Sequence, residues 1–200
     1  RNSILENFEK ILSADDLERE KLYNIVIVGG GPTGVELSGA FAEIKKDVLP
    51  KDYPRIDFTR LNIILLEGSG ALLNSMSCNA QQASEKYLKR MGVIVKKGVF
   101  VKGYDGERVV LSTGEEIISK HVIWAAGITG NLIKGFPDAA IGRSNRIFVD
   151  RVNRVVGFEH IYAIGDIALM KTDKYPEGHP QVANVAINQA KNLTKNLIKI

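Results

Sequence analysis

Apolar side chains recur at helical spacing at the start of the chain and predict two helices. The first is expected over residues 3–12, and its apolar positions are Ile4, Leu5, Phe8, Ile11 and Leu12. Ser13 and Asp16 then form a capping-box pattern. This pattern predicts that a second short helix opens there, before the first strand.

Short apolar runs that alternate with amphipathic stretches indicate buried parallel strands joined by helices. The expected strands are residues 25–28, 63–66, 93–95 and 121–126, the last with Trp124 in the core. The helix after the first strand has the apolar stripe Leu37, Ala40, Phe41, Ile44 and Val48. The helix after the second strand is expected to be capped by Asn79, with the stripe Ala80, Ala83, Tyr87, Leu88 and Met91.

Three short strands with tight turns predict an antiparallel meander before the last parallel strand. They are residues 99–104, 108–112 and 115–118, joined by Asp105-Gly106 and Thr113-Gly114.

The rest of the chain is less regular. Residues 146–150 alternate like a strand, and residues 161–166 predict a buried strand that ends in Gly165 and Asp166. His179 and Pro180 are expected to open a long helix, because proline favours the first helical turn. Its apolar positions are Val182, Ala186, Ala190, Leu193 and Leu197, and this pattern still runs at Ile200.

This order of elements predicts an α/β fold. We expect a Rossmann-like lobe, with a parallel sheet and an antiparallel β-meander, attached to part of a second lobe. Residues 1–22 are interpreted as a helical lead-in that belongs to the second lobe, and residues 23–130 as the nucleotide-binding lobe. Residues 131–200 are interpreted as the truncated return segment of the second lobe.

The most specific chemical signal lies between the first strand and its helix. Gly29, Gly31 and Gly34 form a G-x-G-x-x-G motif there. In such a motif the first glycine allows a tight turn, the second lets a pyrophosphate approach the backbone, and the third lets helix and strand pack closely. Free amides and the positive end of the helix dipole then face the anion. The sequence therefore predicts dinucleotide binding by Gly29, Gly30, Gly31, Pro32, Thr33 and Gly34, with a purely structural glycine-rich loop as the alternative.

An acidic residue completes the motif. Glu67 follows the strand 63–66, where a carboxylate can accept hydrogen bonds from both hydroxyls of an adenosine ribose. The residues after it include no arginine to receive a 2′-phosphate, so NADH is favoured over NADPH. The alternative is that Glu67 only caps the strand end. Its distance from Gly34 exceeds the usual ~20 residues, and the polar, proline-bounded residues 50–54 are interpreted as a surface loop that accounts for the excess.

Composition excludes several other classes of protein. A hydrophobic content of 44% with 25% charged residues is ordinary for a chain that forms a core. The net charge of +4 is too evenly spread to indicate nucleic-acid binding, and no apolar run approaches the ~20 residues of a membrane span. One cysteine, Cys78, excludes a disulfide framework and a redox-active Cys-x-x-Cys pair. The three histidines lack the spacing of metal ligands, so no metal is expected.

The order of motifs resembles the two-dinucleotide-domain flavoprotein reductases, in which an NADH lobe is inserted into an FAD lobe. Within that group, three segments are similar to type II NADH dehydrogenases, the single-subunit, non-pumping NADH:quinone oxidoreductases. The segments are Gly30–Gly39, Val122–Gly127 and His179–Ala183. The missing cysteine pair agrees, since relatives that reduce disulfides need one.

The resemblance implies a set of cofactor contacts. It implies NADH and FAD as cofactors, with contacts at Ala126 and Gly127, at Gly165 and Asp166, and at Gln181, Val182 and Ala183. Asp166 matches the acid that binds the ribityl and phosphate portion of the flavin; a turn-forming Gly-Asp pair is the alternative.

The resemblance also implies catalytic and quinone-site residues. Glu36 matches a glutamate implicated in nicotinamide contact and proton handling; the alternative is a carboxylate that only stabilises the helix amino end. The quinone-site pattern Ala-Gln-x-Ala-x-Gln is replaced here by asparagine at Asn184 and Asn188, which shortens both amides and leaves a solvated helix face as the alternative.

The parent protein is expected to pass hydride from NADH to FAD and electrons on to a membrane quinone. We expect it to associate with the cytoplasmic face of the membrane through a C-terminal region absent here, with a homodimer possible and no nucleic acid bound. The present chain is expected to be soluble, to bind FAD poorly and to lack turnover. Two alternatives stay open: a related reductase with a protein or dioxygen acceptor, and a non-catalytic NADH-binding module.

Overall fold

The computed structural model describes residues 2–131 and 133–198 and divides the chain into two compact units, Arg1–Gly127 and Ile128–Ile200. The division falls three residues before the boundary expected from the sequence. Helices α1 (Asn2–Ile11) and α2 (Asp16–Leu22) belong to the first unit by packing, because Phe8, Ile11 and Leu22 lie in its core. Their expected place in an FAD lobe stays a prediction.

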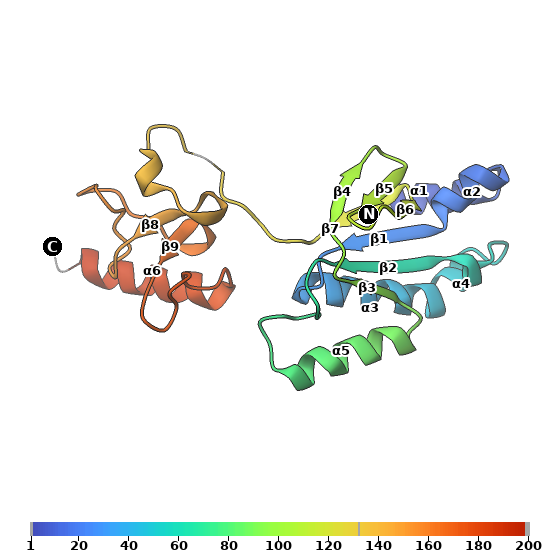
Figure 1. The fold of residues 1–200 in the computed structure, drawn as a ribbon, viewed down its shortest axis with the longest axis horizontal. Coiled ribbons are helices and arrows are strands. Elements are labelled where there is room, and N and C mark those ends of the chain that lie inside the picture. Colours follow the sequence, from blue (N-terminus) through green and yellow to red (C-terminus); the bar gives the residue numbers. More distant parts are fainter. Residues whose placement is uncertain (1, 132, 199–200) are drawn as a thin grey trace. The chain divides into compact units, whose positions relative to one another are not determined.

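A four-stranded parallel sheet forms the centre of the first unit (Figure 1). Its strands are β1 (Asn24–Val28), β2 (Asn62–Glu67), β3 (Ile94–Lys97) and β7 (His121–Trp124), in the order β3-β2-β1-β7. The register pairs Ile25 with Ile63 and with His121. Because successive side chains point to opposite faces, the apolar runs of β1 and β2 supply two cores at once.

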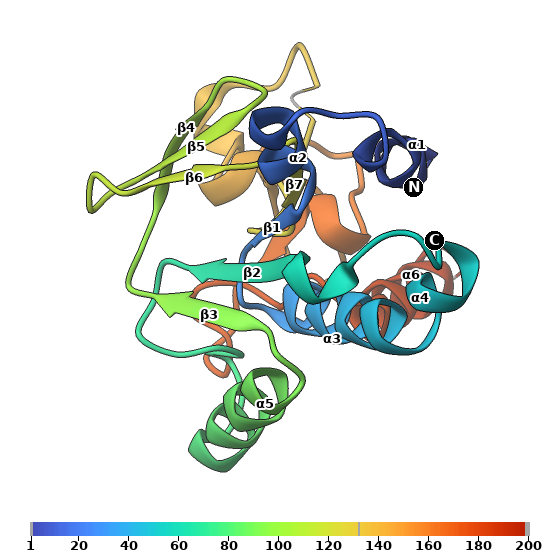
Figure 2. The same cartoon turned by 90° about the vertical axis from the view of Figure 1, so that its right-hand side faces the viewer.

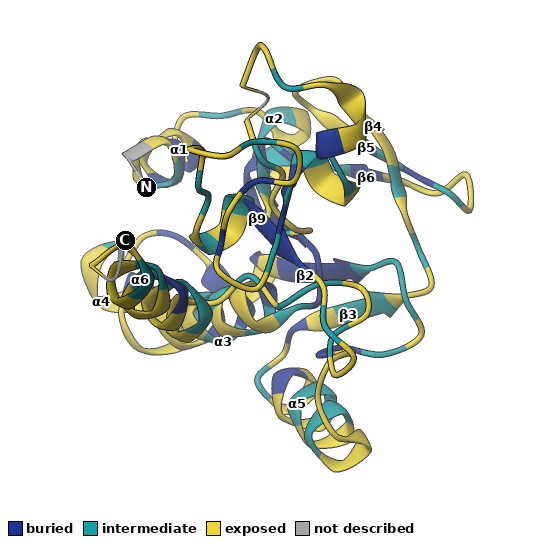
Figure 3. Cartoon of the chain, turned by 90° about the vertical axis from the view of Figure 1, so that its left-hand side faces the viewer, coloured by how far each residue is buried: buried dark blue, intermediate teal, exposed yellow. Residues whose placement is uncertain are grey.

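Helices cover one face of this sheet and the meander covers the other (Figures 1 and 2). Helix α3 (Pro32–Asp47) and helix α5 (Cys78–Arg90) pack against the core that contains Ile25, Ile27 and Leu65. The meander consists of β4 (Val101–Tyr104), β5 (Arg108–Leu111) and β6 (Glu116–Ile118) and packs against Val26 and Val28. The predicted α/β fold with a parallel sheet and an antiparallel meander is confirmed. In Figure 3, β2 is largely buried while most of α5 is exposed.

The second unit is smaller. It contains the parallel pair β8 (Ile147–Val149) and β9 (Ala168–Met170), the single-turn 3-10 helices Asp138–Ala140, Arg143–Asn145 and Gly165–Ile167, and helix α6 (Ala183–Leu197). Arg146 is 6% exposed and ties the unit together, since its Nη2 donates to the carbonyls of Ala168 at 2.6 Å and His179 at 3.0 Å.

Three helix starts differ from those expected. Asp15, not Ser13, caps α2, and its side chain accepts a hydrogen bond from the Glu18 amide at 2.8 Å. Ser77, not Asn79, caps α5. Helix α6 begins at Ala183, so Pro180 precedes it instead of occupying its first turn. In each region the sequence contains several neighbouring residues that could begin a helix. The path of the preceding backbone decides at which of them the helix begins.

The buried faces of α3 and α5 were predicted only in part, since Leu37, Phe41, Leu88 and Met91 lie in or against the core as expected. Gly34, Ser38 and Ala42 face the sheet from α3, whereas Ala40, Ile44 and Val48 are exposed. The close approach of the helix to β1 admits only small side chains along its nearest line, so larger ones such as Phe41 pack at its flank. In α5, Leu88 is buried while Ala83 is exposed and Tyr87 is 65% exposed.

Three further expectations were wrong. Part of the expected surface loop 50–54 is helical, in the short helix α4 (Leu49–Asp52), because Pro50 suits the first helical turn. Trp124 is 63% exposed instead of lying in the core, because it sits at the carboxyl end of β7. Residues 161–166 do not form a buried strand. Within the described residues, Tyr162 makes only an isolated bridge with Arg154, and Ile161 and Ile164 remain exposed.

Candidate dinucleotide site

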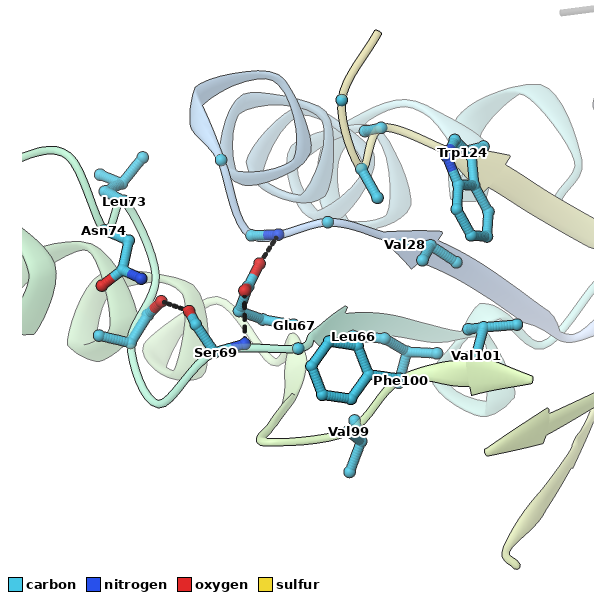
Figure 4. A pocket seen from close by; sticks show the side chains of 18 of the residues that line it. Val28, Leu66, Glu67, Ser69, Leu73, Asn74, Val99, Phe100, Val101 and Trp124 are labelled. Carbon is cyan, nitrogen blue, oxygen red and sulfur yellow. Dashed lines mark hydrogen bonds between the residues drawn. The ribbon is translucent and has the colours of Figure 1, made fainter. Parts of the chain in front are cut away.

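A cavity of about 700 Å³ lies at the carboxyl edge of the parallel sheet in the first unit. Its walls come from the glycine loop after β1, the turn after β2, the segment after β3 and the end of β7 (Figure 4). This is the edge at which open α/β sheets bind ligands, because the loops after the strands converge there.

The three motif glycines meet different surroundings. Gly29 has a φ of +111°, and a Cβ on it would lie 2.7 Å from the backbone of Ala125. A Cβ on Gly34 would lie only 1.8 Å from the Gly29 carbonyl oxygen, so helix and strand touch backbone to backbone. A Cβ on Gly31 would meet nothing within 4 Å. Gly31 is therefore open to the cavity, and the amides that begin α3 have no partners within the helix.

Glu67 is held in position by the backbone. Its Oε2 accepts a hydrogen bond from the Gly30 amide at 2.5 Å, and its Oε1 accepts one from the Ser69 amide at 2.7 Å (Figure 4). Burial acts to raise the pKa of Glu67, but the hydrogen bonds from Ser69 and Gly30 outweigh it and lower the pKa below its usual value. The carboxylate is thus charged at neutral pH, and its oxygens retain lone pairs for a further donor.

The nearest lysines on β3 are paired with carboxylates. Lys97, which is opposite Glu67 in the sheet register, binds Glu85 at 2.7 Å, and Lys96 binds Glu115 at 2.6 Å. The Glu67 carboxylate at the carboxyl end of β2 is therefore negatively charged, and the two lysines of β3 nearest to it form ion pairs with other carboxylates.

The structure brings together some of the residues predicted for the site and separates others. Seven line the cavity: Gly29, Gly30, Gly31, Pro32, Glu67, Ala126 and Gly127. Thr33 and Gly34 lie in the first turn of α3 and do not line the cavity. Glu36 is exposed on α3 and does not line the cavity.

Sequence reasoning missed several cavity residues. Phe100 and Trp124 are 64% and 63% exposed and line it, as do Ser69, Asn74 and Ser75. Phe100 lies in residues 99–104, whose alternating pattern predicted a strand. This pattern predicts which side chains share a face of the strand, but it does not predict that a cavity lies beside one of those faces.

The remaining predicted residues lie in the second unit. Gly165 and Asp166 form a 3-10 turn against α6, where the Gly165 amide donates to Gln189 Oε1 at 2.7 Å and Gln181 Nε2 donates to the Asp166 carbonyl at 3.1 Å. Asp166 is exposed, as are Val182, Ala183 and Asn184. Asn188 is also exposed and lines a smaller cavity of about 330 Å³, which Asn184 does not line.

Within residues 2–131 and 133–198, no group of three or more His, Cys, Asp or Glu side chains could hold a metal ion. Over the same part of the chain, no helix has the length and apolar character that crossing a membrane requires. Cys78, the only cysteine, is exposed at the start of α5 and does not line the cavity.

The parallel sheet, the close-packed glycine loop and the acid that ends the second strand define a dinucleotide-binding domain of the Rossmann class. The chain belongs to the pyridine nucleotide-disulphide oxidoreductase family, whose model matches residues 3–190.

Individual relatives agree with the resemblance noted in the motifs. The chain is 30% identical to the type II NADH:quinone oxidoreductase Ndh of Mycobacterium tuberculosis over 98% of its own length and 43% of that protein. It is 28% identical to a probable NADH dehydrogenase of Dictyostelium discoideum, over its full length and 45% of that protein. The structure of NDH2 from Plasmodium falciparum in complex with NADH matches with a TM-score of 0.75 and 25% identity, over 84% of this chain and 36% of that one. The chain thus spans less than half the length of these relatives.

Proposed function

We propose that this chain is the NADH-binding part of an FAD-dependent NADH:quinone oxidoreductase of the type II kind. The observation that carries the proposal is the cavity in which the glycine loop and the Glu67 carboxylate face the same space. The electron acceptor proposed here, a quinone, is taken from the names of the relatives.

In this proposal the nucleotide is bound by three kinds of contact. The amides at the start of α3 bind the pyrophosphate, which Gly31 allows to come close. Glu67 accepts hydrogen bonds from the adenosine ribose hydroxyls. A 2′-phosphate on that ribose would face a carboxylate whose nearest lysines are already paired, so NADH is favoured over NADPH.

The opposite half of NADH would extend across β1 toward β7, where Ala126 and Gly127 leave room at the cavity wall. The protein's task there is to orient the nicotinamide and exclude water, since the cofactor carries the redox chemistry. Glu36 is retained as a proposed proton-handling residue. It is exposed and could act only at an edge of the site.

The second unit offers residues that fit part of a flavin. Asp166 presents an exposed carboxylate at a glycine turn, and Gly165, with a φ of +74°, brings that turn against Ala186 of α6. Asp166 would hold ribityl hydroxyls, and the amino end of α6 near Gln181, Val182 and Ala183 would favour negative charge on the ring. FAD, when bound, supplies a hydride acceptor. Asn184 and Asn188 remain proposed quinone-site residues, and membrane association at the cytoplasmic face and a homodimer remain proposals.

Titration of NADH and NADPH tests the nucleotide site. Trp124 is the only tryptophan and lines the cavity, so quenching of its fluorescence reports binding. We expect NADH to bind more tightly than NADPH. Glu67→Ala should weaken NADH binding by ~1–3 kcal/mol, because the ribose hydroxyls lose their acceptor.

Glu116→Ala is the matched control, because Glu116 pairs with Arg108 on the meander and does not line the cavity. It should leave both affinities unchanged. Equal binding of the two nucleotides, before and after the change at Glu67, would remove the cofactor assignment.

A further inference from the structure

Phe100 has a large apolar side chain that does not belong to either hydrophobic core of the first unit. It is 64% exposed, whereas its neighbours Val99 and Val101 pack against the core beneath the meander. The strand-like alternation along this segment turns Phe100 away from that core and toward the cavity, which it lines (Figure 4).

The backbone around Phe100 is pinned to the acid that ends β2. The Val99 amide donates to the Glu67 carbonyl at 3.1 Å. The Phe100 amide donates to Ser112 Oγ at 3.1 Å, and the Phe100 carbonyl accepts from the Ser112 amide at 2.7 Å. The backbone of Phe100 is therefore held in place although its side chain is exposed.

The ring of Phe100 lies directly against the backbone of Gly68. A Cβ placed on Gly68 would fall 2.3 Å from Phe100 Cε1. Gly68 directly follows Glu67 in the sequence. The Phe100 ring therefore packs against the backbone next to the residue that carries the carboxylate.

The strand order indicates where the base of a dinucleotide bound in the proposed site would lie. The pyrophosphate site follows β1 and the ribose acid follows β2, and the next strand in the sheet is β3. The adenine would continue in the same direction beyond its ribose, toward the segment that follows β3, which contains Phe100. The nicotinamide half runs the opposite way, toward β7.

We propose that Phe100 is the stacking platform for the adenine of the dinucleotide, a positioning residue that sets affinity through the base and not through the sugar or phosphates. This inference rests on the proposed NADH site and adds a residue to it. An aromatic ring already held in place loses little side-chain freedom on binding, and a purine offers a flat face of matching size.

The test compares ligands with and without adenine on the full chain, by calorimetric titration. ADP-ribose carries the adenine half, and reduced nicotinamide mononucleotide carries only the other half. Phe100→Ala should weaken ADP-ribose and NADH roughly tenfold or more, the scale measured for bases stacked on aromatic side chains. The same substitution should leave the mononucleotide unchanged, and Phe100→Tyr should retain wild-type binding of all three.

Tyr87→Ala is the matched control, since Tyr87 is 65% exposed on α5 and does not line the cavity. Gly68→Ala supplies a second, independent variant. Its new methyl group displaces the ring, so it should weaken ADP-ribose in the wild type but add nothing in the Phe100→Ala background.

Two results overturn the inference alone: a Phe100→Ala chain that binds ADP-ribose as tightly as the wild type, or one that loses the mononucleotide to the same extent. A wild-type chain that binds neither NADH nor ADP-ribose would instead remove the proposed function, and the inference with it.

Discussion

Two glycines of the glycine loop differ in the space that surrounds their Cα atoms. Gly31 and Gly34 belong to the same motif, yet a methyl group on Gly31 would meet open space and one on Gly34 would overlap the Gly29 carbonyl. Of these two glycines, Gly34 is required by the packing of the helix on the strand, whereas Gly31 leaves the space in which we propose that the pyrophosphate binds.

These two glycines make a matched pair for mutation. Gly34→Ala should lower the free energy of unfolding by about 1–3 kcal/mol or more, because the helix must move away from β1. Gly31→Ala should change stability by less than ~0.5 kcal/mol but weaken NADH, because its methyl group occupies the pyrophosphate's approach. Urea unfolding and the Trp124 titration measure the two effects. A stable Gly34→Ala protein with normal binding would show that the close contact is not required.

At the same scale, Glu67 could be located from the sequence and Phe100 could not. The acid is recognised by its place after a buried strand, which is a property of the chain order. Phe100 is recognised only by the direction of its ring, which depends on how the segment after β3 is hydrogen-bonded to Glu67 and Ser112.

At the scale of secondary structure, element types were predicted better than their ends. The strands of the parallel sheet and the meander lie where the apolar runs and turn residues indicated. The caps of α2 and α5 moved by two residues, because a cap is chosen by which side chain reaches a free amide and not by residue type alone.

The start of α2 provides a test of this choice. Asp15→Ala should lower the free energy of unfolding by ~0.5–2 kcal/mol, since the Glu18 amide loses its acceptor. Ser13→Ala should cost less than ~0.5 kcal/mol, because that hydroxyl donates to the Lys10 carbonyl and caps nothing. Chemical unfolding followed by circular dichroism compares the two variants. A larger loss for Ser13→Ala would restore the cap expected from the sequence.

At the scale of the whole first unit, His121 joins distant parts of the chain. It lies on β7, is 4% exposed, and accepts a hydrogen bond at Nε2 from the Asn7 amide of α1 at 3.4 Å. The Nδ2 group of Asn7 can only donate, so Nε2 of His121 is the acceptor in this contact and carries no proton there. Burial lowers the pKa of His121 below its ordinary value of 6.5.

This burial predicts a pH dependence of stability. Below pH 6.5 the unfolded chain binds a proton at this histidine that the folded chain resists. The free energy of unfolding should therefore be highest above that pH and fall as the pH drops toward the folded pKa, by at most ~1.4 kcal/mol per pH unit for one proton. Unfolding measured just below pH 6.5, well above the ordinary glutamate pKa of 4.5, keeps the contribution of the carboxylates small.

His121→Gln should flatten the slope over this range, whereas His160→Gln should leave it unchanged, since the His160 side chain is 92% exposed. An unaltered slope in the His121 variant would mean that another group carries the titration.

The chain order alone determined the α/β class, the succession of strands, the glycine motif and the acid that follows the second strand. These features depend on local periodicity and on residue types at fixed spacing, which each segment carries by itself.

Tertiary packing decided the rest. It selected Ser38 and Ala42 for the inner face of α3, left Trp124 exposed, and turned Phe100 into the cavity, because the available space at each point is set by neighbouring segments distant in sequence. The expected strand at residues 161–166 makes the same point: an apolar run becomes a strand only where other strands lie beside it to receive its hydrogen bonds.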